Sequence, residues 1–410
     1  MDRMSQTLRD TAASSADVAV SASQARQSEA QKPQSKHQLS DYSDVPKYDK
    51  PVGTYVSLYA GAGGLDIGFA LAGFAPVWVS ELDKAALDTH DKAFERLAKT
   101  RPHLRGHSYE SRSGDLLAIP DDELPEEGSA DLVIGGPPCQ GFSVAGKMDP
   151  NDERSKHVFH YMDMVERIKP KAFVLENVKA LYENKRWEGI RQMLLKRADE
   201  LGYNATLKLV NASHFGVPQA RERMLLLGVR KNIGNPVVPE PTTETDVPTV
   251  REALSQLPHY GEPGNDSLCK ARITTAKAPV LRRSPFAGML FNGAGRPLNL
   301  DGPSVTLAAS IGGNKTPIVD QRALEFEDTE SWVVEYHARL WEEGDDAVVY
   351  DVPDYLRRLT VEEAAAIQTF PLGMEWCGPQ SAKYRQIGNA VPPRLALAVG
   401  EAVKKVLRLN

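Results

Sequence analysis

The sequence has 410 residues, 41% of them hydrophobic and 25% charged, with a formal net charge of -6 at pH 7. This length suffices for two domains, and the composition is ordinary for a soluble globular protein and excludes fibrous classes. No apolar run approaches the roughly 20 residues of a membrane-spanning helix, and the first residues lack the apolar core of a secretory signal. We therefore expect neither secretion nor membrane insertion.

Three cysteines, Cys139, Cys269 and Cys377, lie far apart and form no Cys-x-x-Cys pair. This spacing supports neither a disulfide framework nor a zinc site. We expect reduced thiols and no bound metal.

The first 230 residues divide into a tail and an alternating segment. Residues 1–50 are predicted to be a disordered tail, because they are rich in Ser, Ala, Gln and Asp and contain few large apolar residues. Over residues 51–230, short apolar runs alternate with helical patterns, which indicates an α/β fold with a parallel sheet. Strands are predicted at residues 55–59, 77–79, 132–134, 173–175, 205–210 and 224–229, with one more ending near Gly114. Helices are predicted from Asn151 to Pro170 and over residues 187–201.

The alternation stops after Arg230. Residues 231–355 contain many Pro and Gly and little periodicity, which is typical of a separate, irregular domain. Regular structure is expected again over residues 356–410, where Thr360 and Glu363 form a capping box and residues 393–407 form a last helix.

Charge is unevenly distributed within the irregular segment. Residues 269–315 carry seven Lys or Arg and one Asp, whereas residues 320–354 carry two Arg and twelve acidic residues. A plain solvated surface remains one interpretation of such runs. The other is that the basic stretch contacts a polyanion.

Polar residues and glycines follow the predicted strands. In an open parallel sheet ligands bind outside the carboxyl ends of the strands, so these residues are expected to face one cleft. The loop starting at Gly61 has Asp66 where a dinucleotide fold needs its third Gly, which disfavours a pyrophosphate. Glu81 offers an acceptor for two ribose hydroxyls and Asp115 one for an adenine amino group. The set indicates an adenosyl ligand without pyrophosphate.

Cys139 lies on the rigid turn "GGPPCQGFS", directly after a strand. Its position suggests a presented thiol, and the thiolate form is the nucleophile. Arg221 and Arg223 alternate with Glu222 ahead of a strand, so they are candidates for the positive charge that favours a thiolate.

Six ordered motifs resemble the cytosine-C5 DNA methyltransferase family, which uses S-adenosylmethionine. The resemblance covers roughly residues 53–230 and 356–410. The motifs are "YAGAGGLDIGFALAGF", "GGPPCQGFS", "LENV", "HFGVPQARER", "RLTVEEAAAIQTFP" and "QIGNAVPP". The first has Tyr59 where the family commonly has Phe.

The resemblance implies a Rossmann-like methyltransferase sheet, split between residues 51–230 and 356–410, with residues 231–355 inserted as a mostly irregular or β target-recognition domain. The implied reaction transfers a methyl group to C5 of a cytosine flipped out of duplex DNA. Cys139 adds to C6, Glu176 contacts N3, and Arg221 and Arg223 hold O2 and orient Glu176.

Further contacts follow from the same resemblance. The implied cofactor contacts come from Tyr59, Ala60, Gly61, Gly63, Gly64, Leu65, Glu81, Leu82, Asp115, Leu116, Pro137, Asn389, Ala390 and Val391. DNA contacts are expected from Gln140, Ser143, Lys147, Arg282, Arg283, Arg296, Thr306, Leu307 and Lys315. A bacterial source would make the protein cytoplasmic and nucleoid-associated. We expect a monomer, with a restriction endonuclease as a candidate cognate partner.

Three alternatives remain. A tRNA enzyme of the same family would carry a Cys-Phe-Thr triplet, which is absent from this sequence. A thymidylate-synthase-like enzyme would need neither the insert nor an adenosyl pocket. A DNA-binding regulator without activity would not need Cys139, Glu176, Arg221 and Arg223 together.

Overall fold

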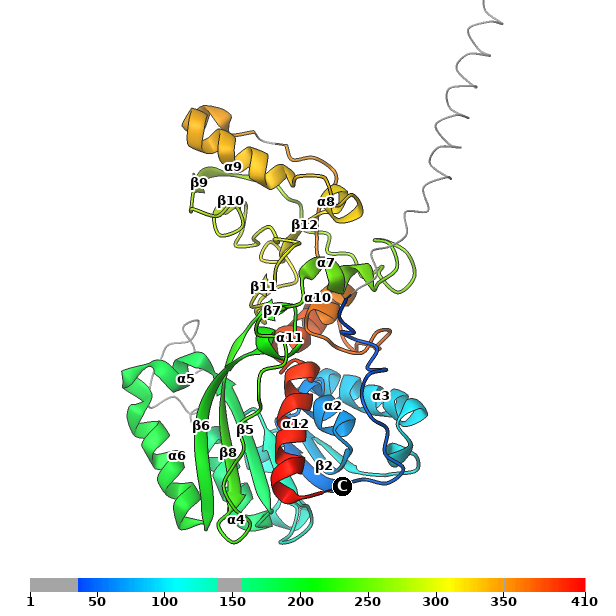
Figure 1. Cartoon of the computed structure of the whole chain (residues 1–410), viewed down its shortest axis with the longest axis vertical. Coiled ribbons are helices and arrows are strands. Elements are labelled where there is room, and N and C mark those ends of the chain that lie inside the picture. Colours follow the sequence, from blue (N-terminus) through cyan, green and yellow to red (C-terminus); the bar gives the residue numbers. More distant parts are fainter. Residues whose placement is uncertain (1–35, 139–155, 350, 410) are drawn as a thin grey trace, which may run out of the picture. The chain divides into compact units, whose positions relative to one another are not determined.

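A seven-stranded mixed sheet is the largest sheet of the computed structural model, which describes residues 36–138, 156–349 and 351–409 (Figure 1). Its strand order is β3-β2-β1-β4-β5-β8-β6. The strands are β1 (Gly53–Leu58), β2 (Phe74–Glu81), β3 (Glu110–Ser113), β4 (Leu132–Gly135), β5 (Ala172–Val178), β6 (Tyr203–Asn211) and β8 (Glu222–Arg230). The pairs among the first five strands are parallel, as the sequence predicts. β8 instead runs antiparallel to both neighbours, because no crossover helix separates it from β6.

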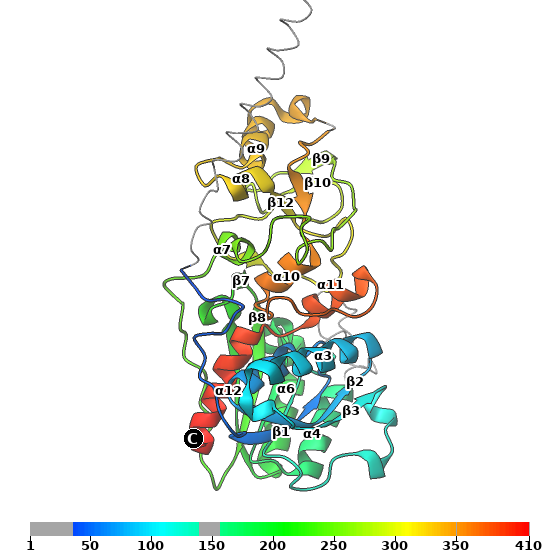
Figure 2. The ribbon, with the colours of Figure 1, turned by 90° about the vertical axis from the view of Figure 1, so that its right-hand side faces the viewer.

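Helices cover both faces of this sheet. One face packs against α4 (Lys156–Ile168), α5 (Lys179–Glu183) and α6 (Glu188–Glu200). The other packs against α2 (Gly64–Leu71) and α12 (Pro393–Leu407), with α3 (Lys84–Thr100) beside α2 (Figure 2). The alternation of side chains along β1 explains the two layers, since Val56 and Leu58 face α4 while Tyr55 faces α2.

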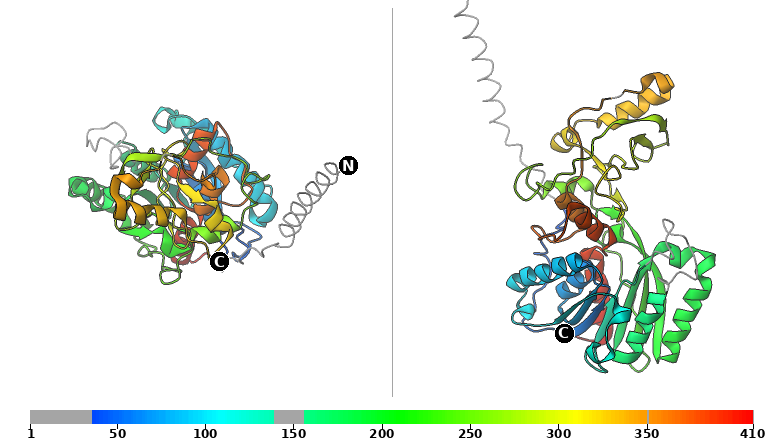
Figure 3. Two further views of the ribbon diagram at one scale, coloured as in Figure 1. Left: turned by 90° about the horizontal axis from the view of Figure 1, so that it is seen from above. Right: turned by 180° about the vertical axis from the view of Figure 1, so that it is seen from behind.

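The end of the chain returns to its beginning. α12 packs along α2 so closely that a Cβ on Gly68 would lie 2.2 Å from the Cβ of Ala396 (Figures 1 and 3). Ahead of it lie α10 (Val361–Ile367) and α11 (Gln380–Asn389). The predicted capping box is confirmed, since the Thr360 side chain accepts from the Glu363 N–H and the Glu363 carboxylate accepts from the Thr360 N–H.

Short elements make up residues 231–355. They are α7 (Val250–Ser255), β9 (Thr275–Val280), β10 (Met289–Phe291), β11 (Ser304–Val305), β12 (Ile318–Asp320), α8 (Gln321–Glu325) and α9 (Trp332–Glu343). β9 pairs with β10, and β10 packs with α9 around a small apolar cluster that includes Phe291 and Tyr336. Two pairings tie this segment to its neighbours in sequence, β12 to β13 (Leu356–Arg358) and β11 to β7 (Gln219–Ala220).

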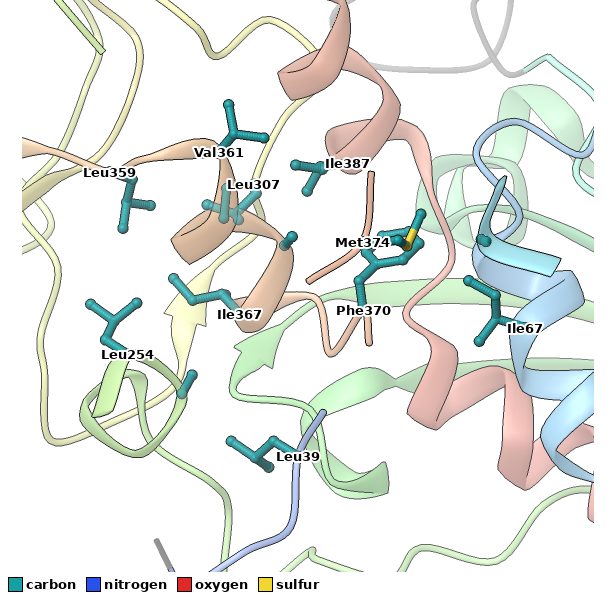
Figure 4. Packing of buried hydrophobic residues seen from close by; sticks show 14 of the residues in the cluster. Leu39, Ile67, Leu254, Leu307, Leu359, Val361, Ile367, Phe370, Met374 and Ile387 are labelled. Carbon is teal, nitrogen blue, oxygen red and sulfur yellow. The ribbon is translucent and has the colours of Figure 1, made fainter. Parts of the chain in front are cut away.

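Residues 37–50 pack against the rest of the protein, which corrects the expectation that all of residues 1–50 are a disordered tail. Leu39, Tyr42 and Val45 are buried, and Leu39 lies in the same cluster as Ile67, Leu254 and Phe370 (Figure 4). Arg101 donates to the carbonyls of Tyr42, Val45 and Pro46. This short apolar set is hidden in a polar stretch, and its burial offsets the conformational entropy lost on ordering.

Candidate functional site

A cavity of about 290 Å³ opens at the carboxyl ends of β1, β2, β4 and β5. β2 and β4 flank β1, so the strand order reverses at β1, the place where ligands bind in open α/β sheets. Residues 356–410, the return segment, supply another wall through Gln386, Gly388, Asn389, Ala390 and Val391. Residues more than 300 positions apart in sequence therefore line one cavity.

The glycine loop forms the turn from β1 into α2. Tyr59 and Gly61 have φ of 58°, and Gly63, the N-cap of α2, has φ of 84°, so the turn uses left-handed backbone at alternate residues. A Cβ on Gly64 would lie 2.2 Å from the Val391 carbonyl oxygen. The close approach of this loop to the return segment therefore requires glycine.

Glu81 projects from the end of β2 into the cavity. Its Oε2 accepts from the Gly61 N–H at 2.8 Å and its Oε1 from the Asp83 N–H at 2.9 Å, which leaves further lone pairs on both oxygens. Burial raises the pKa of this carboxyl, although the two backbone donors lower it. Beside it, the Leu82 side chain is 69% exposed, an apolar surface at the cavity. A fixed acceptor beside an apolar face fits a ribose and an adenine.

Most expected cofactor residues line this cavity. Those that do are Tyr59, Ala60, Gly61, Gly64, Leu65, Glu81, Leu82, Pro137, Asn389, Ala390 and Val391. Gly63, Asp115 and Leu116 are not among the lining residues that the structure describes. Asp115 is exposed and its carboxylate caps the turn that follows, accepting from the Leu117 N–H at 3.0 Å.

Glu176 and Arg223 form an ion pair within the cavity. Arg223 Nε lies 2.8 Å from Glu176 Oε1, and both side chains are nearly buried. They face each other because Val178 and Arg223 are partners in the β5–β8 register, which brings the start of β8 beside the end of β5. Burial raises the pKa of Glu176, although the charges of Arg223 and Arg221 lower it. The carboxyl therefore holds a proton more readily than a free Glu.

Arg221 also lines the cavity, but the contacts of its guanidinium differ from those of Arg223. Nη1 donates to the Leu307 carbonyl at 3.1 Å and Nη2 to the Gly388 carbonyl at 2.8 Å. The side chain is 1% exposed.

The residues ahead of Cys139 form part of the same wall. Asn177 donates through Nδ2 to the Pro137 carbonyl at 3.1 Å, which holds the Pro137–Pro138 segment at the cavity that Glu176 also lines. Cys139, Gln140, Ser143 and Lys147 lie outside the described residues, as does the expected helix cap at Asn151.

The expected DNA contacts of the insert divide into exposed and buried residues. Arg282, Arg283, Arg296, Thr306 and Lys315 are exposed. Leu307 is 1% exposed, so its side chain is buried within the protein and is not presented at the surface. It is buried because it packs with Ile387 and Ile367 (Figure 4).

A buried pair lies beneath the glycine loop. Asp66 Oδ1 lies 3.4 Å from His90 Nε2, and both residues are 0% exposed. Burial lowers the pKa of His90, but hydrogen bonds and charge from Asp66 and Asp91 outweigh it and raise the pKa to about 9. The sequence offered only a polar residue in the first turn of α2, and nothing in it pointed to His90.

Arg385, at the cavity, was not predicted, whereas its partner Asp83 is one of the polar residues expected after the second strand. The Arg385 and Asp83 side chains lie 3.1 Å apart at the cavity; Arg385 comes from α11 and Asp83 is the N-cap of α3.

Within the described ranges, no group of three His, Cys, Asp or Glu is arranged to hold a metal ion, and no helix has the length and apolar character of a membrane span.

The sheet order and the cavity at its switch point define a Rossmann-like methyltransferase fold. A protein described as a DNA modification methyltransferase encoded within an E. coli prophage has a similar structure, with a TM-score of 0.58, 21% identity, and coverage of 87% of this chain and 99% of that chain.

Sequence comparison gives the family. The sequence model of C-5 cytosine-specific DNA methylases matches residues 53–405, so the chain belongs to this family. The Type II methyltransferase M1.HphI of Haemophilus parahaemolyticus is 31% identical over 86% of this chain and 87% of that protein. M.FnuDI of Fusobacterium nucleatum is 30% identical over 86% of this chain and 94% of that protein. The protein is a DNA cytosine methyltransferase.

Proposed function

We propose that the enzyme methylates C5 of a cytosine flipped out of a specific duplex DNA sequence, through a covalent bond between Cys139 and C6 of the base. The buried Glu176–Arg223 pair carries this proposal, because it places a carboxyl whose pKa is raised by burial in the cavity where the expected cofactor residues converge. The pair also lines the same cavity as Pro137 and Pro138, which precede Cys139 in the sequence.

The proposed chemistry begins at the Cys139 sulfur. Its thiolate adds to C6, and the ring electrons move to C5, which becomes nucleophilic enough to take a methyl group. After transfer, loss of the C5 proton restores the double bond and expels the thiolate. The base that removes this proton is water in the simplest case.

Glu176 offsets the charge that forms on the ring. A carboxyl whose pKa is raised by burial donates a hydrogen bond or proton to N3 as electron density builds there. Arg223 fixes the orientation of the carboxyl through the 2.8 Å contact. Arg223 Nη1 donates to the Glu222 carbonyl at 2.7 Å, and we propose that Nη2 donates to the base O2.

The cavity is proposed to bind S-adenosylmethionine, which supplies an electrophilic methyl group on a sulfonium. Glu81 accepts from the ribose hydroxyls, and Leu82 covers the adenine. Asn389 and the glycine loop hold the methionine part. Burial raises the pKa of Tyr59, which lines the cavity, and the negative charge of Asp115 raises it further. We propose that this nearby Asp115 carboxylate accepts a hydrogen bond from the adenine amino group.

Residues 231–355 are proposed to read the DNA sequence, with Arg282, Arg283, Arg296, Lys315 and Thr306 toward phosphates or bases. Relatives such as M1.HphI are named Type II methyltransferases. We therefore propose that this enzyme is the modification partner of a restriction endonuclease, and that it acts where cellular DNA lies.

The decisive experiment supplies methyl-labelled S-adenosylmethionine with plasmid DNA in one reaction and tRNA in another. We expect label in DNA alone, and label in tRNA alone would overturn the choice of substrate. Bisulfite sequencing of the product identifies the target. A duplex with 5-fluorocytosine at that position should then become covalently attached to wild-type protein.

The matched variant is Cys139→Ser. It is expected to abolish methyl transfer and covalent attachment while S-adenosylhomocysteine still binds by calorimetry, because the expected cofactor contacts do not include residue 139. Methyl transfer by this variant at more than about one hundredth of the wild-type rate would contradict nucleophilic catalysis by this thiol.

A further inference from the structure

The Arg221 guanidinium lies where three parts of the chain meet. Arg221 itself follows β7, its partner Leu307 follows β11 of the insert, and its partner Gly388 lies near the end of α11. Leu307 is the residue after Thr306, an expected DNA contact. Gly388 is the residue before Asn389, an expected cofactor contact. The buried Arg221 side chain therefore connects the backbone beside Thr306 to the backbone beside Asn389.

The insert is also held to β7 by an extended set of hydrogen bonds. β11 pairs in parallel with β7, with Ser304 opposite Gln219 and Val305 opposite Ala220. Thr306 Oγ1 donates to the Ala220 carbonyl at 2.9 Å, and Gln219 Oε1 accepts from the Leu307 N–H at 3.1 Å. Residue 307 is thus held at its N–H by Gln219 and at its carbonyl by Arg221.

The return segment reaches the same place through a glycine. A Cβ on Gly388 would lie 2.5 Å from the Ala308 carbonyl oxygen, so the backbone of α11 touches the insert directly. Tyr384 and Ile387 of α11 pack in the same apolar cluster as Leu307 and Ile311. A shift of residues 306–308 would therefore be transmitted to the backbone beside Asn389.

From these contacts we infer that Arg221 is a positioning residue, whose guanidinium fixes the DNA-contacting Thr306 relative to the cofactor-binding Asn389. This role rests on the proposed function of both residues. It differs from the expected contact of Arg221 with the base, and it requires arginine. A planar guanidinium directs separate N–H groups at two carbonyls, whereas a lysine ammonium on a flexible chain does not reproduce that fork.

The test is a double-mutant cycle with Arg221→Lys and Gln219→Met. Lysine keeps the positive charge beside Glu176 but gives up the forked contact, and methionine removes the acceptor for the Leu307 N–H at similar volume. Gln192→Met, on the exposed side of α6, is the matched control. Each protein is assayed for methyl incorporation into plasmid DNA over ranges of DNA and S-adenosylmethionine. Calorimetry with S-adenosylhomocysteine measures cofactor binding.

Arg221→Lys is expected to raise the KM for DNA about tenfold or more, the effect of one lost charge-assisted hydrogen bond, with kcat changed less than about threefold. S-adenosylhomocysteine should bind several-fold more weakly. Gln219→Met should also raise the KM for DNA. The double variant should be little worse than Arg221→Lys, because both changes release the backbone of the same residue, Leu307.

Two results would overturn the inference while leaving the methyltransferase intact. One is a fall in kcat with the KM for DNA unchanged in Arg221→Lys, which would assign Arg221 to the reacting base. The other is a double variant whose increase in the KM for DNA equals the product of the increases in the two single variants. If Arg221→Lys does not fold, an unchanged KM for DNA in Gln219→Met would reject it. Wild-type protein that methylates no DNA would instead reject the proposed function itself.

Discussion

Gly64→Ala tests whether the contact between the glycine loop and the return segment shapes the cofactor cavity. The added Cβ would lie 2.2 Å from the Val391 carbonyl oxygen, which is backbone and has no rotamer to change. Because carbon and oxygen need more than 3 Å, the two backbones must separate by about 1 Å. Overpacking of this kind costs about 1–3 kcal/mol, which corresponds to roughly 5- to 150-fold in an equilibrium constant.

We expect Gly64→Ala to weaken S-adenosylhomocysteine binding by a factor in this range, measured by isothermal titration calorimetry. The control is Gly189→Ala in α6, where nothing lies within 4 Å of the new Cβ. That change should leave binding unchanged and stabilise the helix by up to about 1 kcal/mol. A folded Gly64→Ala protein that binds S-adenosylhomocysteine within about twofold of wild type would refute the reasoning.

Two further predictions concern stability. The pKa of His90 is raised to about 9, so the Asp66–His90 pair stabilises the fold below about pH 6.5, and this contribution is lost as pH rises through 9. Urea unfolding should show a corresponding decline that His90→Gln abolishes, and an unchanged decline in His90→Gln would exclude this pair as its source. Leu39→Ala should cost about 2–4 kcal/mol of unfolding free energy, whereas Leu82→Ala should cost less than about 0.5 kcal/mol and weaken S-adenosylhomocysteine binding instead. Equal losses of stability would contradict the burial of Leu39.

The central sheet was predictable because its signals are local. Leu132, Val133 and Ile134 form a continuous apolar run closed by glycines and prolines, the pattern of a strand buried on both faces. The first two apolar strands and their polar ends could likewise be placed in one cleft from the rule for open parallel sheets. The antiparallel direction of β8 was missed, since it depends on the absence of a helix between two strands rather than on either strand.

Helix α9 and the packing of residues 37–50 were not predicted, although the sequence contains a local signal for each. In α9, Val333, Tyr336, His337 and Leu340 are buried at helical spacing within a strongly acidic stretch, and the charge concealed the period. The buried set in residues 37–50 was similarly diluted by polar neighbours. Both patterns are visible in the sequence once single apolar residues are counted by spacing rather than by density.

The remaining features depend on contacts between distant residues. Leu307 follows an exposed threonine in a basic stretch, and nothing local indicates that it packs against Ile387. The partners of Arg221 are backbone carbonyls at positions 307 and 388, so no side-chain type at those positions announces them. Arg223 was assigned to Glu176 only through the family motif, and its 2.8 Å contact depends on the register of β5 and β8.

The cavity wall comes from two distant parts of the chain, the glycine loop and the return segment, and this has a consequence for synthesis of the protein. A ribosome that has finished the glycine loop must still complete the insert and α11 before Val391 can close against Gly64. Nascent or prematurely terminated chains therefore lack a complete binding pocket and are expected not to methylate DNA. Conversely, two separately expressed fragments divided within the insert would regain activity only upon association, which makes the fold suited to split-protein reporters.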